Sequence, residues 1–384
     1  MRAREETGVA LALCLGASQG ALLVLTPILA AVAADLDVST AAAGQLRTIS
    51  GLVAGTTALL SGLAAARVGL RDLLIGALAF LATGAAVSAG SPHFAVLAFA
   101  QILIGVGIGV SYSAAVAASA EWSKPEERSR VLAFALLGPP LAWVIGMPVA
   151  GLVGEVDWRL SWVAVPLASA VVALVVLVRR EATPPAPVRA DLRTVLTHPG
   201  VLAWSVGELL AFSAWVGTLV FVGALFVEAY GLSVAATGLV LGIGALAYVP
   251  GNFLFRRWVD VYPRRLLIGL ALGAAALVAA LGASREGVWE SLVIFALLSF
   301  LAGGRTLAGS VRGLDLAPEL RLGVTGVRTA ALQFGSFVGA AVGGIALALG
   351  GFTALGLAFA TLFVLAAAPH LRPAHSPQGS TLTE

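Results

Sequence analysis

The chain has 384 residues, of which 59% are hydrophobic and 11% are charged, and its formal net charge is +3. Soluble domains carry about 25% charged residues, so this composition excludes a soluble globular protein, whose surface needs more polar side chains than this chain has. It indicates an integral membrane protein, and the lack of strand-like alternation favours helices over a closed barrel.

Twelve apolar runs follow one another along the chain, each close to the ~20 residues that a membrane-spanning helix needs. Their approximate bounds are Gly8–Ala34, Ala42–Ala65, Leu73–Gly90, Phe94–Ala120, Val131–Gly154, Leu160–Val178, Gly200–Val227, Ser233–Phe255, Leu266–Leu281, Ser291–Val311, Leu322–Leu349 and Phe352–Ala368. The first run exceeds the ~7–15 apolar residues of a signal peptide, so we expect it to be retained. The sequence therefore predicts an all-α membrane protein with twelve transmembrane helices.

Basic residues in the loops predict the orientation. With the N-terminus in the cytoplasm, eighteen of the 23 Lys and Arg residues fall on the cytoplasmic side, and only Arg159 and Arg285 fall outside. This bias follows the positive-inside rule. We expect a multi-pass protein of the cell (inner) membrane with both termini in the cytoplasm. The three remaining basic residues, Arg47, Arg305 and Arg328, lie within spans.

No pattern in the sequence is typical of a metal, disulfide or nucleotide site. The single cysteine, Cys14, lies in the first predicted helix, and the four His residues lie in loops or the tail. No Walker-type loop is present, and no Asp pair or Ser–His pair lies deep in a span. We expect no metal, no cofactor, no nucleic-acid partner and no enzymatic activity.

The chain repeats itself once, at an offset of 193 or 194 residues. Val38–Gly44 (VSTAAAG) matches Leu232–Gly238 (LSVAATG), and Arg71–Gly76 (RDLLIG) matches Arg264–Gly269 (RRLLIG). Two halves with the same in–out order are typical of secondary transporters whose substrate site lies between the halves near mid-membrane. The predicted organisation is a six-helix bundle at 1–178, a cytoplasmic linker at 179–199, a second six-helix bundle at 200–369 and a cytoplasmic tail at 370–384.

Over nearly its full length the chain resembles the major facilitator superfamily. Gly62–Arg71 (GLAAARVGLR) is similar to the family's loop 2–3 signature, except that Ala66 stands where the signature has Asp. In the family this loop latches the two conformations. The resemblance therefore implies the major facilitator fold and a latch made of Gly62, Arg67, Gly69, Arg71, Asp260, Arg264 and Arg265.

The segment Gly138–Gly151 (GPPLAWVIGMPVAG) resembles the helix 5 signature of the family's antiporters. With the following Trp158-Arg159, it points to the drug:proton antiporter and sugar-efflux (arabinose efflux permease-like) group. Ordinary close packing and kinking of helices is an equally good interpretation of these small residues and prolines. The residues concerned are Gly138, Pro139, Gly146, Pro148 and Gly151. The family's helix 4 signature has an Arg where this chain has Gln101, so proton coupling through that position does not follow.

Three ionisable residues enter the predicted spans of the second half to similar depth. Arg305 lies roughly 9 Å inside its helix end and Glu208 roughly 12 Å, from the rise of 1.5 Å per residue. A lone charge at such depth is costly, so we expect Glu208 to pair with Arg305, with Arg328 nearby. The repeat places Leu15, Tyr112 and Ala135 at the equivalent positions of the first half, which favours function over scaffolding. The alternative is snorkelling to the membrane surface, strongest for Arg328 and preferred for Arg47.

Uncharged polar and aromatic residues are candidates for lining a substrate cavity around this pair. The candidates are Ser18, Gln19, Gln45, Gln101, Tyr112, Trp143, Trp215, Tyr248, Asn252 and Gln333. Any one of them is more often a packing or helix–helix hydrogen-bonding residue, but as a set they suit a mid-sized amphipathic solute.

These observations and the resemblance together predict a secondary transporter that works by alternating access. We expect it to export a small organic solute (a drug, sugar or metabolite) in exchange for protons carried by Glu208, and to act as a monomer in the bilayer. An uncoupled uniporter or a proton symporter for a small organic anion is the alternative, since Ala66 and Gln101 replace charged residues of the signatures.

Overall fold

The computed structural model describes residues 2–124, 127–181, 192–198, 200–259, 261–284, 286–317 and 320–371. Most of the predicted linker, the tail beyond Leu371 and Asp260 therefore lie outside the described residues. Every described element is helical. In chain order they are α1 (Arg2–Leu23), α2 (Leu25–Asp35), α3 (Thr40–Val68), α4 (Leu70–Ala89), α5 (Phe94–Glu121), α6 (Arg128–Ala135), α7 (Gly138–Gly154), α8 (Trp158–Trp162), the π-helical η1 (Val163–Leu167), α9 (Ala168–Val178), α10 (Leu192–Thr197), α11 (Val201–Tyr230), α12 (Val234–Leu246), α13 (Tyr248–Leu254), α14 (Arg256–Val259), α15 (Pro263–Ala283), α16 (Val288–Leu316), α17 (Arg321–Ala367) and the 3₁₀ turn η3 (Ala368–His370).

Nine stretches of the described residues are long and apolar enough to cross a membrane. They include most of the predicted helices, but α7 is shorter, with 17 residues, and the last two predicted helices both lie in α17. The chain turns within α17 at Gly350 and Gly351, whose backbone angles are not helical. The all-helical prediction is confirmed, whereas the count of twelve spans stays a prediction.

Prolines explain three interruptions that the sequence analysis did not predict. A proline has no N–H to donate to the carbonyl four residues earlier, so a helix is weakened at that point. In each case the preceding helix ends at the residue four positions before a proline. The pairs are Leu23 with Pro27, Ala135 with Pro139, and Leu246 with Pro250. Each interruption therefore needs only a local bend within one predicted span.

Equivalent residues of the two repeats begin equivalent helices. The Ser39 hydroxyl accepts a hydrogen bond from the Ala42 N–H at 3.1 Å and caps α3. The Ser233 hydroxyl accepts one from the Ala236 N–H at 3.2 Å and caps α12. Such caps satisfy N–H groups that have no partner within the helix, and the two caps lie 194 residues apart, as the repeat predicts.

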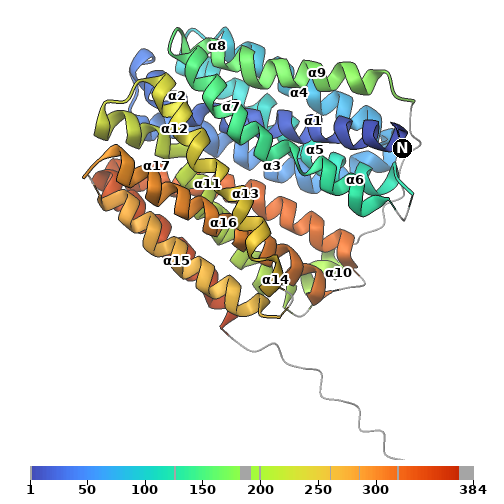
Figure 1. The fold of residues 1–384 in the computed structure, drawn as a ribbon. Coiled ribbons are helices and arrows are strands. Elements are labelled where there is room, and N and C mark those ends of the chain that lie inside the picture. Colours follow the sequence, from blue (N-terminus) through green and yellow to red (C-terminus); the bar gives the residue numbers. More distant parts are fainter. Residues whose placement is uncertain are drawn as a thin grey trace, which may run out of the picture.

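The N-terminal helices (α1–α9) and the C-terminal helices (α11–α17) lie on opposite sides of the molecule in Figure 1, where blue to green faces yellow to red. We call the end where α1 begins and α10 lies the terminal end, and the other the far end. Hydrogen bonds between the two sets lie toward the far end. Thr40 donates to Glu228, Glu155 accepts from the Ala235 N–H at 2.8 Å, and Gln45 donates to the Ala340 carbonyl at 3.2 Å.

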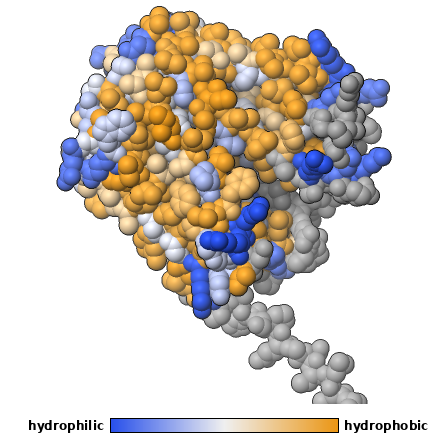
Figure 2. All heavy atoms as spheres, viewed as in Figure 1, coloured by the Kyte–Doolittle hydropathy of each residue, from blue (hydrophilic) through white to orange (hydrophobic). Residues whose placement is uncertain are grey.

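The outer surface is largely apolar. Large side chains such as Leu349, Trp289 and Phe253 are more than half exposed, and Figure 2 shows hydrophobic residues covering the body of the molecule, with hydrophilic ones mainly near its margins. Exposing so much apolar surface to water would be unfavourable by about 25 cal/mol per Å². The surface is that of a protein whose helices face lipid.

Candidate functional site

Glu208 of α11 lies at the centre of a buried acid–base cluster. Its Oε1 accepts a hydrogen bond from Nη1 of Arg305 in α16 at 2.9 Å, and its Oε2 accepts one from Nε of Arg328 in α17 at 3.0 Å. Glu208 is fully buried, Arg305 is 4% exposed and Arg328 is 22% exposed. The three residues that the sequence analysis placed at similar depth thus lie together, and each oxygen of the carboxylate faces one guanidinium group.

Backbone carbonyls hold the same two arginines. Arg305 donates through Nη2 to the Gly207 carbonyl at 3.0 Å, and Arg328 donates through Nη2 to the Thr306 carbonyl at 2.9 Å. The Arg328 guanidinium also lies 5.3 Å from the centre of the Phe212 ring, within range of a cation–π contact. Neither side chain snorkels to a helix end. Both guanidinium groups would keep these backbone carbonyls as hydrogen-bond acceptors if Glu208 lost its charge.

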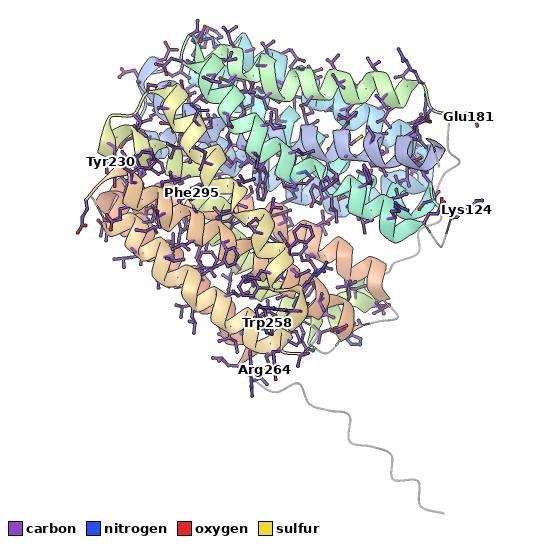
Figure 3. The ribbon with its side chains drawn as sticks, in the orientation of Figure 1. Lys124, Glu181, Tyr230, Trp258, Arg264 and Phe295 are labelled. Carbon is purple, nitrogen blue, oxygen red and sulfur yellow. The ribbon has the colours of Figure 1, made fainter. Side chains whose placement is uncertain are left out.

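Four aromatic rings form a second cluster between the N-terminal and C-terminal helices. Trp143 of α7 meets Tyr248 of α13 edge-on, with centroids 4.8 Å apart, and Trp215 of α11 stacks on Tyr248 at 6.0 Å and on Phe295 of α16 at 6.4 Å. Trp143 donates through Nε1 to Oε1 of Gln19 at 3.2 Å. Figure 3 labels Phe295 on α16. The sequence analysis had named the others but not Phe295, because nothing in the sequence separates it from other apolar residues of its helix.

The remaining candidates for the cavity lie at several places. Gln101 and Gln333 are fully buried, Tyr112 is half-buried, and Asn252 donates to the Tyr248 carbonyl of its own helix at 3.3 Å. Ser18, also fully buried, donates to the Ile108 carbonyl at 3.4 Å. These contacts are ordinary helix-packing bonds, so a role for these residues in solute binding stays a prediction.

Arg47 contradicts the interpretation preferred for it from the sequence. It is 1% exposed, and it donates to the Ser50 and Ser336 hydroxyls at 3.0 and 3.5 Å. A snorkelling arginine keeps its guanidinium group in water, whereas this one is enclosed between α3 and α17. Sequence position alone could not show that the side chain points inward.

Two arginines of the predicted latch make equivalent contacts in the two repeats. Arg71 donates to the Leu177 and Val178 carbonyls at 3.3 and 2.8 Å, and Arg264 donates to the His370 and Leu371 carbonyls. Each donor and acceptor of the first set lies 193 residues before its counterpart.

The other latch residues are less fully placed. Gly69 joins α3 to α4 with a φ of 79°, which favours glycine, while Arg67 is exposed and the Arg265 guanidinium lies over the Tyr262 ring. Asp260 and the surroundings of Gly62 lie outside the described residues. A contact that locks the conformations therefore stays a prediction.

The small residues of the helix 5 signature allow close helix crossings. A Cβ on Gly138 would lie 2.2 Å from the Ala12 carbonyl oxygen, and one on Gly151 would lie 2.7 Å from Cα of Gly238. Pro148 packs against Gly242, and a Cβ on Gly146 would meet only Val165. Pro139 lies at the start of α7. These contacts support the packing interpretation and leave a specific role in antiport as a prediction.

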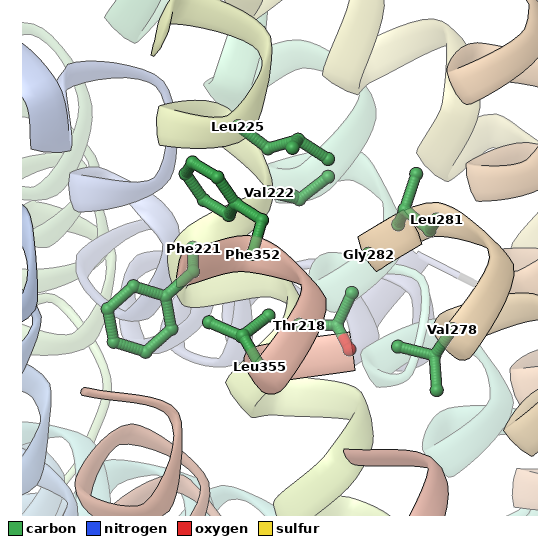
Figure 4. A pocket seen from close by; sticks show the side chains of 9 residues that line it. All are labelled: Thr218, Phe221, Val222, Leu225, Val278, Leu281, Gly282, Phe352 and Leu355. Carbon is green, nitrogen blue, oxygen red and sulfur yellow. The ribbon is translucent and has the colours of Figure 1, made fainter. Parts of the chain in front are cut away.

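A small apolar pocket lies away from the charged cluster. Figure 4 shows the residues of α11, α15 and α17 that line it, which are Thr218, Phe221, Val222, Leu225, Val278, Leu281, Gly282, Phe352 and Leu355. Thr218 is the only polar side chain among them and donates to the Ala214 carbonyl of its own helix. The pocket offers no group that would recognise a polar solute.

Sequence comparison matches the chain to one protein family along most of its length. The sequence profile of the Major Facilitator Superfamily matches residues 11–227 and again residues 203–384. Relatives include the "Transcription regulatory protein OpdE" of Pseudomonas aeruginosa, which is 27% identical over 94% of this chain and 91% of its own length. The chloramphenicol efflux pump Rv0191 of Mycobacterium tuberculosis is 27% identical over 91% and 89% of the two chains. A probable sugar efflux transporter of Helicobacter pylori is 22% identical over 88% of each.

A solved structure has the same fold. A bacterial homologue of the human lysosomal transporter Spinster, crystallised in an inward-facing and occupied conformation, superposes with a TM-score of 0.77 at 15% identity, over 94% of this chain and 95% of that one. At this identity the likeness supports the fold alone.

Proposed function

Because the chain belongs to the Major Facilitator Superfamily, we propose that it exports a small organic solute by alternating access, in exchange for protons. Its family makes it a membrane transporter rather than an enzyme. The names of the mycobacterial and Helicobacter relatives favour efflux of a drug, sugar or metabolite. The charges and aromatic rings near the middle of the molecule suit an amphipathic solute.

The proposed arrangement in the membrane is twelve spans in two six-helix bundles, with both termini in the cytoplasm. The equivalent contacts of Arg71 and Arg264 and the two matches of the family profile support the duplication. The positive-inside bias supports the orientation. In that orientation the far end is the periplasmic side and is closed in this structure. The proposed partners are the solute, protons and the bilayer, and the proposed active form is the monomer.

The single observation that carries the proton-coupled mechanism is the position of Glu208. It is the only fully buried carboxylate among the described residues, and its charge is shared by two guanidinium groups. Protonation would remove that charge and leave Arg305 and Arg328 with hydrogen-bond donors that lack an anionic acceptor. A polar or anionic group of the solute would then take the place of the carboxylate. Joint binding of this kind would carry solute and proton in the same direction, as in the symporter alternative. Exchange requires instead that a donor group of the solute compete with the proton for the ionised Glu208 carboxylate, so that each displaces the other at one site.

Proton flux in energised, everted membrane vesicles tests this mechanism. A panel of sugars, organic anions, chloramphenicol and cationic dyes is added to vesicles holding the wild type, Glu208→Gln, or the control Glu286→Gln, which changes an exposed carboxylate. We expect at least one solute to collapse the pH gradient with the wild type and with Glu286→Gln, and at most about a tenth as fast with Glu208→Gln, a loss of about 1.4 kcal/mol or more.

Other outcomes separate the alternatives. A solute that collapses the gradient equally with Glu208→Gln would keep antiport but remove Glu208 from proton transfer. Labelled solute that moves while the gradient stays intact would establish the uniporter. A solute that leaves the vesicle lumen together with protons would establish the symporter, because the lumen of an everted vesicle corresponds to the outside of the cell.

A further inference from the structure

Arg47 is a fully buried charge for which the mechanism above has no use. Nη1 and Nη2 donate only to the neutral hydroxyls of Ser50 and Ser336. Its Nε has no hydrogen-bond partner among the described residues, and no carboxylate in that part of the chain forms an ion pair with it. Arg305 and Arg328, by contrast, share Glu208. Arg47 thus has donors to spare and no anion.

Two buried amides lie close to the same place. The contacts between α3 and α5 advance in the same direction along both helices, so the two helices run parallel. A Cβ on Gly105 would meet Ser50 and Val53. One on Gly109, a turn later, would meet Ala54 and Thr57. One turn earlier, this register places Gln101 opposite the turn of α3 that carries Arg47. Oε1 of Gln101 has no hydrogen-bond partner among the described residues.

The second amide belongs to α17. Gln333 lies one turn before Ser336 and Phe337 on the helix face toward α3, since residues three or four apart share a face. Both polar atoms of the Gln333 side chain lack partners in the described part of the chain. Donors and acceptors left unpaired inside a protein are costly, and the helix registers place both amides on faces of α5 and α17 that pack against α3.

The scaffold does not require a charge at position 47. The repeat places Val240 or Leu241 at the equivalent position of α12, and Leu241 is fully buried. An apolar side chain therefore serves the same helix in the other repeat. An ionisable residue within a membrane span is more often functional than structural, and an unpaired one at an interface that alternating access would open calls for a ligand.

We propose that Arg47, with Ser50, Ser336 and Gln101, is a binding site for a monovalent anion of the carboxylate class, which opens when α3 and α17 separate. The planar guanidinium group offers two parallel N–H donors that match the two oxygens of a carboxylate. The proposal rests on the alternating access proposed above, but not on proton transfer by Glu208.

The position of the site favours an aromatic carboxylate as its probe. Aromatic rings flank it along the same face of α3. Phe221 of α11 lies against Gly44, one turn before Arg47, and Phe334 of α17 lies against Gly55, two turns beyond it. A ring placed between these side chains could carry a carboxylate toward Arg47, so benzoate is a suitable probe and benzamide its uncharged counterpart.

The test measures a distance across the far end of the full chain, held in lipid nanodiscs. Spin labels at Asp37→Cys and Leu349→Cys, two exposed positions on either side of the α3–α17 interface, are placed in a Cys14→Ser background. Double electron–electron resonance at neutral pH then measures their separation with benzoate, benzamide or chloride. We expect benzoate to populate a longer distance and benzamide not to. Arg47→Leu should need at least about tenfold more benzoate, a loss of about 1.4 kcal/mol, and Arg47→Lys should fall between the two.

Thermal unfolding without ligand provides a second readout. Arg47→Leu should unfold at a higher temperature than the wild type, because it removes an uncompensated buried charge. A merely structural arginine would show the opposite.

The outcomes separate the proposals. An equal response to benzoate and benzamide, or an unchanged response in Arg47→Leu, would overturn the anion site. The same lengthening with chloride alone, lost in Arg47→Leu, would support the site and assign it to a free inorganic anion. Glu208→Gln should keep the benzoate response, so loss of proton coupling alone leaves this proposal standing. A separation that never changes under any condition would instead contradict alternating access.

Discussion

The carboxylate of Glu208 lies where a glycine leaves room for it. A Cβ on Gly309 of α16 would lie 2.4 Å from Oε1 and 2.6 Å from Oε2 of Glu208, closer than any real contact. Trp204 donates to the Gly309 carbonyl at 3.1 Å and fixes the same turn. The acid–base cluster therefore depends on a residue that carries no charge and no side chain.

Replacement of Gly309 by Ala should disrupt this cluster. The added methyl group would push the Glu208 carboxylate away from the two guanidinium groups, and overpacking of this kind costs about 1–3 kcal/mol. We expect a lower unfolding temperature in detergent and loss of coupled proton flux. Gly269→Ala is the matched control, because a Cβ there meets nothing within 4 Å. Equal unfolding temperatures and equal proton flux in the two variants would show that the Glu208 carboxylate has room to move.

For individual residues, the sequence predicted which charged side chains lie together but not which residues surround them. Arg305, Arg328 and Glu208 could be brought together because helical rise converts sequence position into depth. Gly309 could not be identified, since its role depends on the rotation of two helices against each other. The burial of Arg47 was missed for the same reason, because its depth near a helix end fits snorkelling as well as burial.

Among the helices, one arginine in each repeat ties the end of a distant helix to the start of another. Arg71 of α4 donates to the last carbonyls of α9, and Arg264 of α15 does the same for the end of α17 and η3. The last four carbonyls of a helix have no partner within it. A guanidinium group satisfies two of them and also complements the negative end of the helix dipole.

Loss of Arg71 should therefore loosen the end of α9. Hydrogen bonds to charged groups contribute about 1.5–3 kcal/mol, so Arg71→Ala should lower the unfolding temperature and speed amide hydrogen exchange near Val178. Arg264→Ala should do the same near Leu371. Arg67→Ala, which removes an exposed arginine from the last turn of α3, serves as the control. If Arg67→Ala loosened α9 as much, the effect would come from net charge rather than from these contacts.

Helix positions followed from apolar run length, whereas helix breaks did not. Run length is fixed by bilayer thickness, so most predicted spans coincide with helices of the structure. The breaks before Pro27 and Pro250 were missed because membrane helices often tolerate proline, and whether a proline bends or interrupts a helix depends on its neighbours. The turn at Gly350 and Gly351 lies between two predicted apolar runs, Leu322–Leu349 and Phe352–Ala368, and Gly351 has a φ of 64°.

For the molecule as a whole, the closed far end is the feature on which transport would depend. α7 and α12 approach so closely that Gly151 and Gly238 are in backbone contact, and a Cβ on Gly223 of α11 would collide with the Thr26 carbonyl. Helices that cross through small residues have no interlocking side-chain ridges at the crossing. They can therefore meet and separate as rigid units. Alternating access requires this end to open in every cycle.

A cross-link across the far end should arrest transport. Thr40 of α3 donates a hydrogen bond to Glu228 at the end of α11, so a Thr40→Cys/Glu228→Cys pair in a Cys14→Ser background should be joined by a short bifunctional methanethiosulfonate reagent, whose spacer replaces the length of the lost side chains. We expect solute flux to fall to background when the cross-link forms and to return with a reducing agent. The control pair, Thr7→Cys/Arg180→Cys, replaces a 3.0 Å hydrogen bond within the N-terminal set and should cross-link without arrest, because that set moves as a unit. Continued transport by the cross-linked Thr40–Glu228 pair would show that the far end does not open, and that the solute leaves by another route.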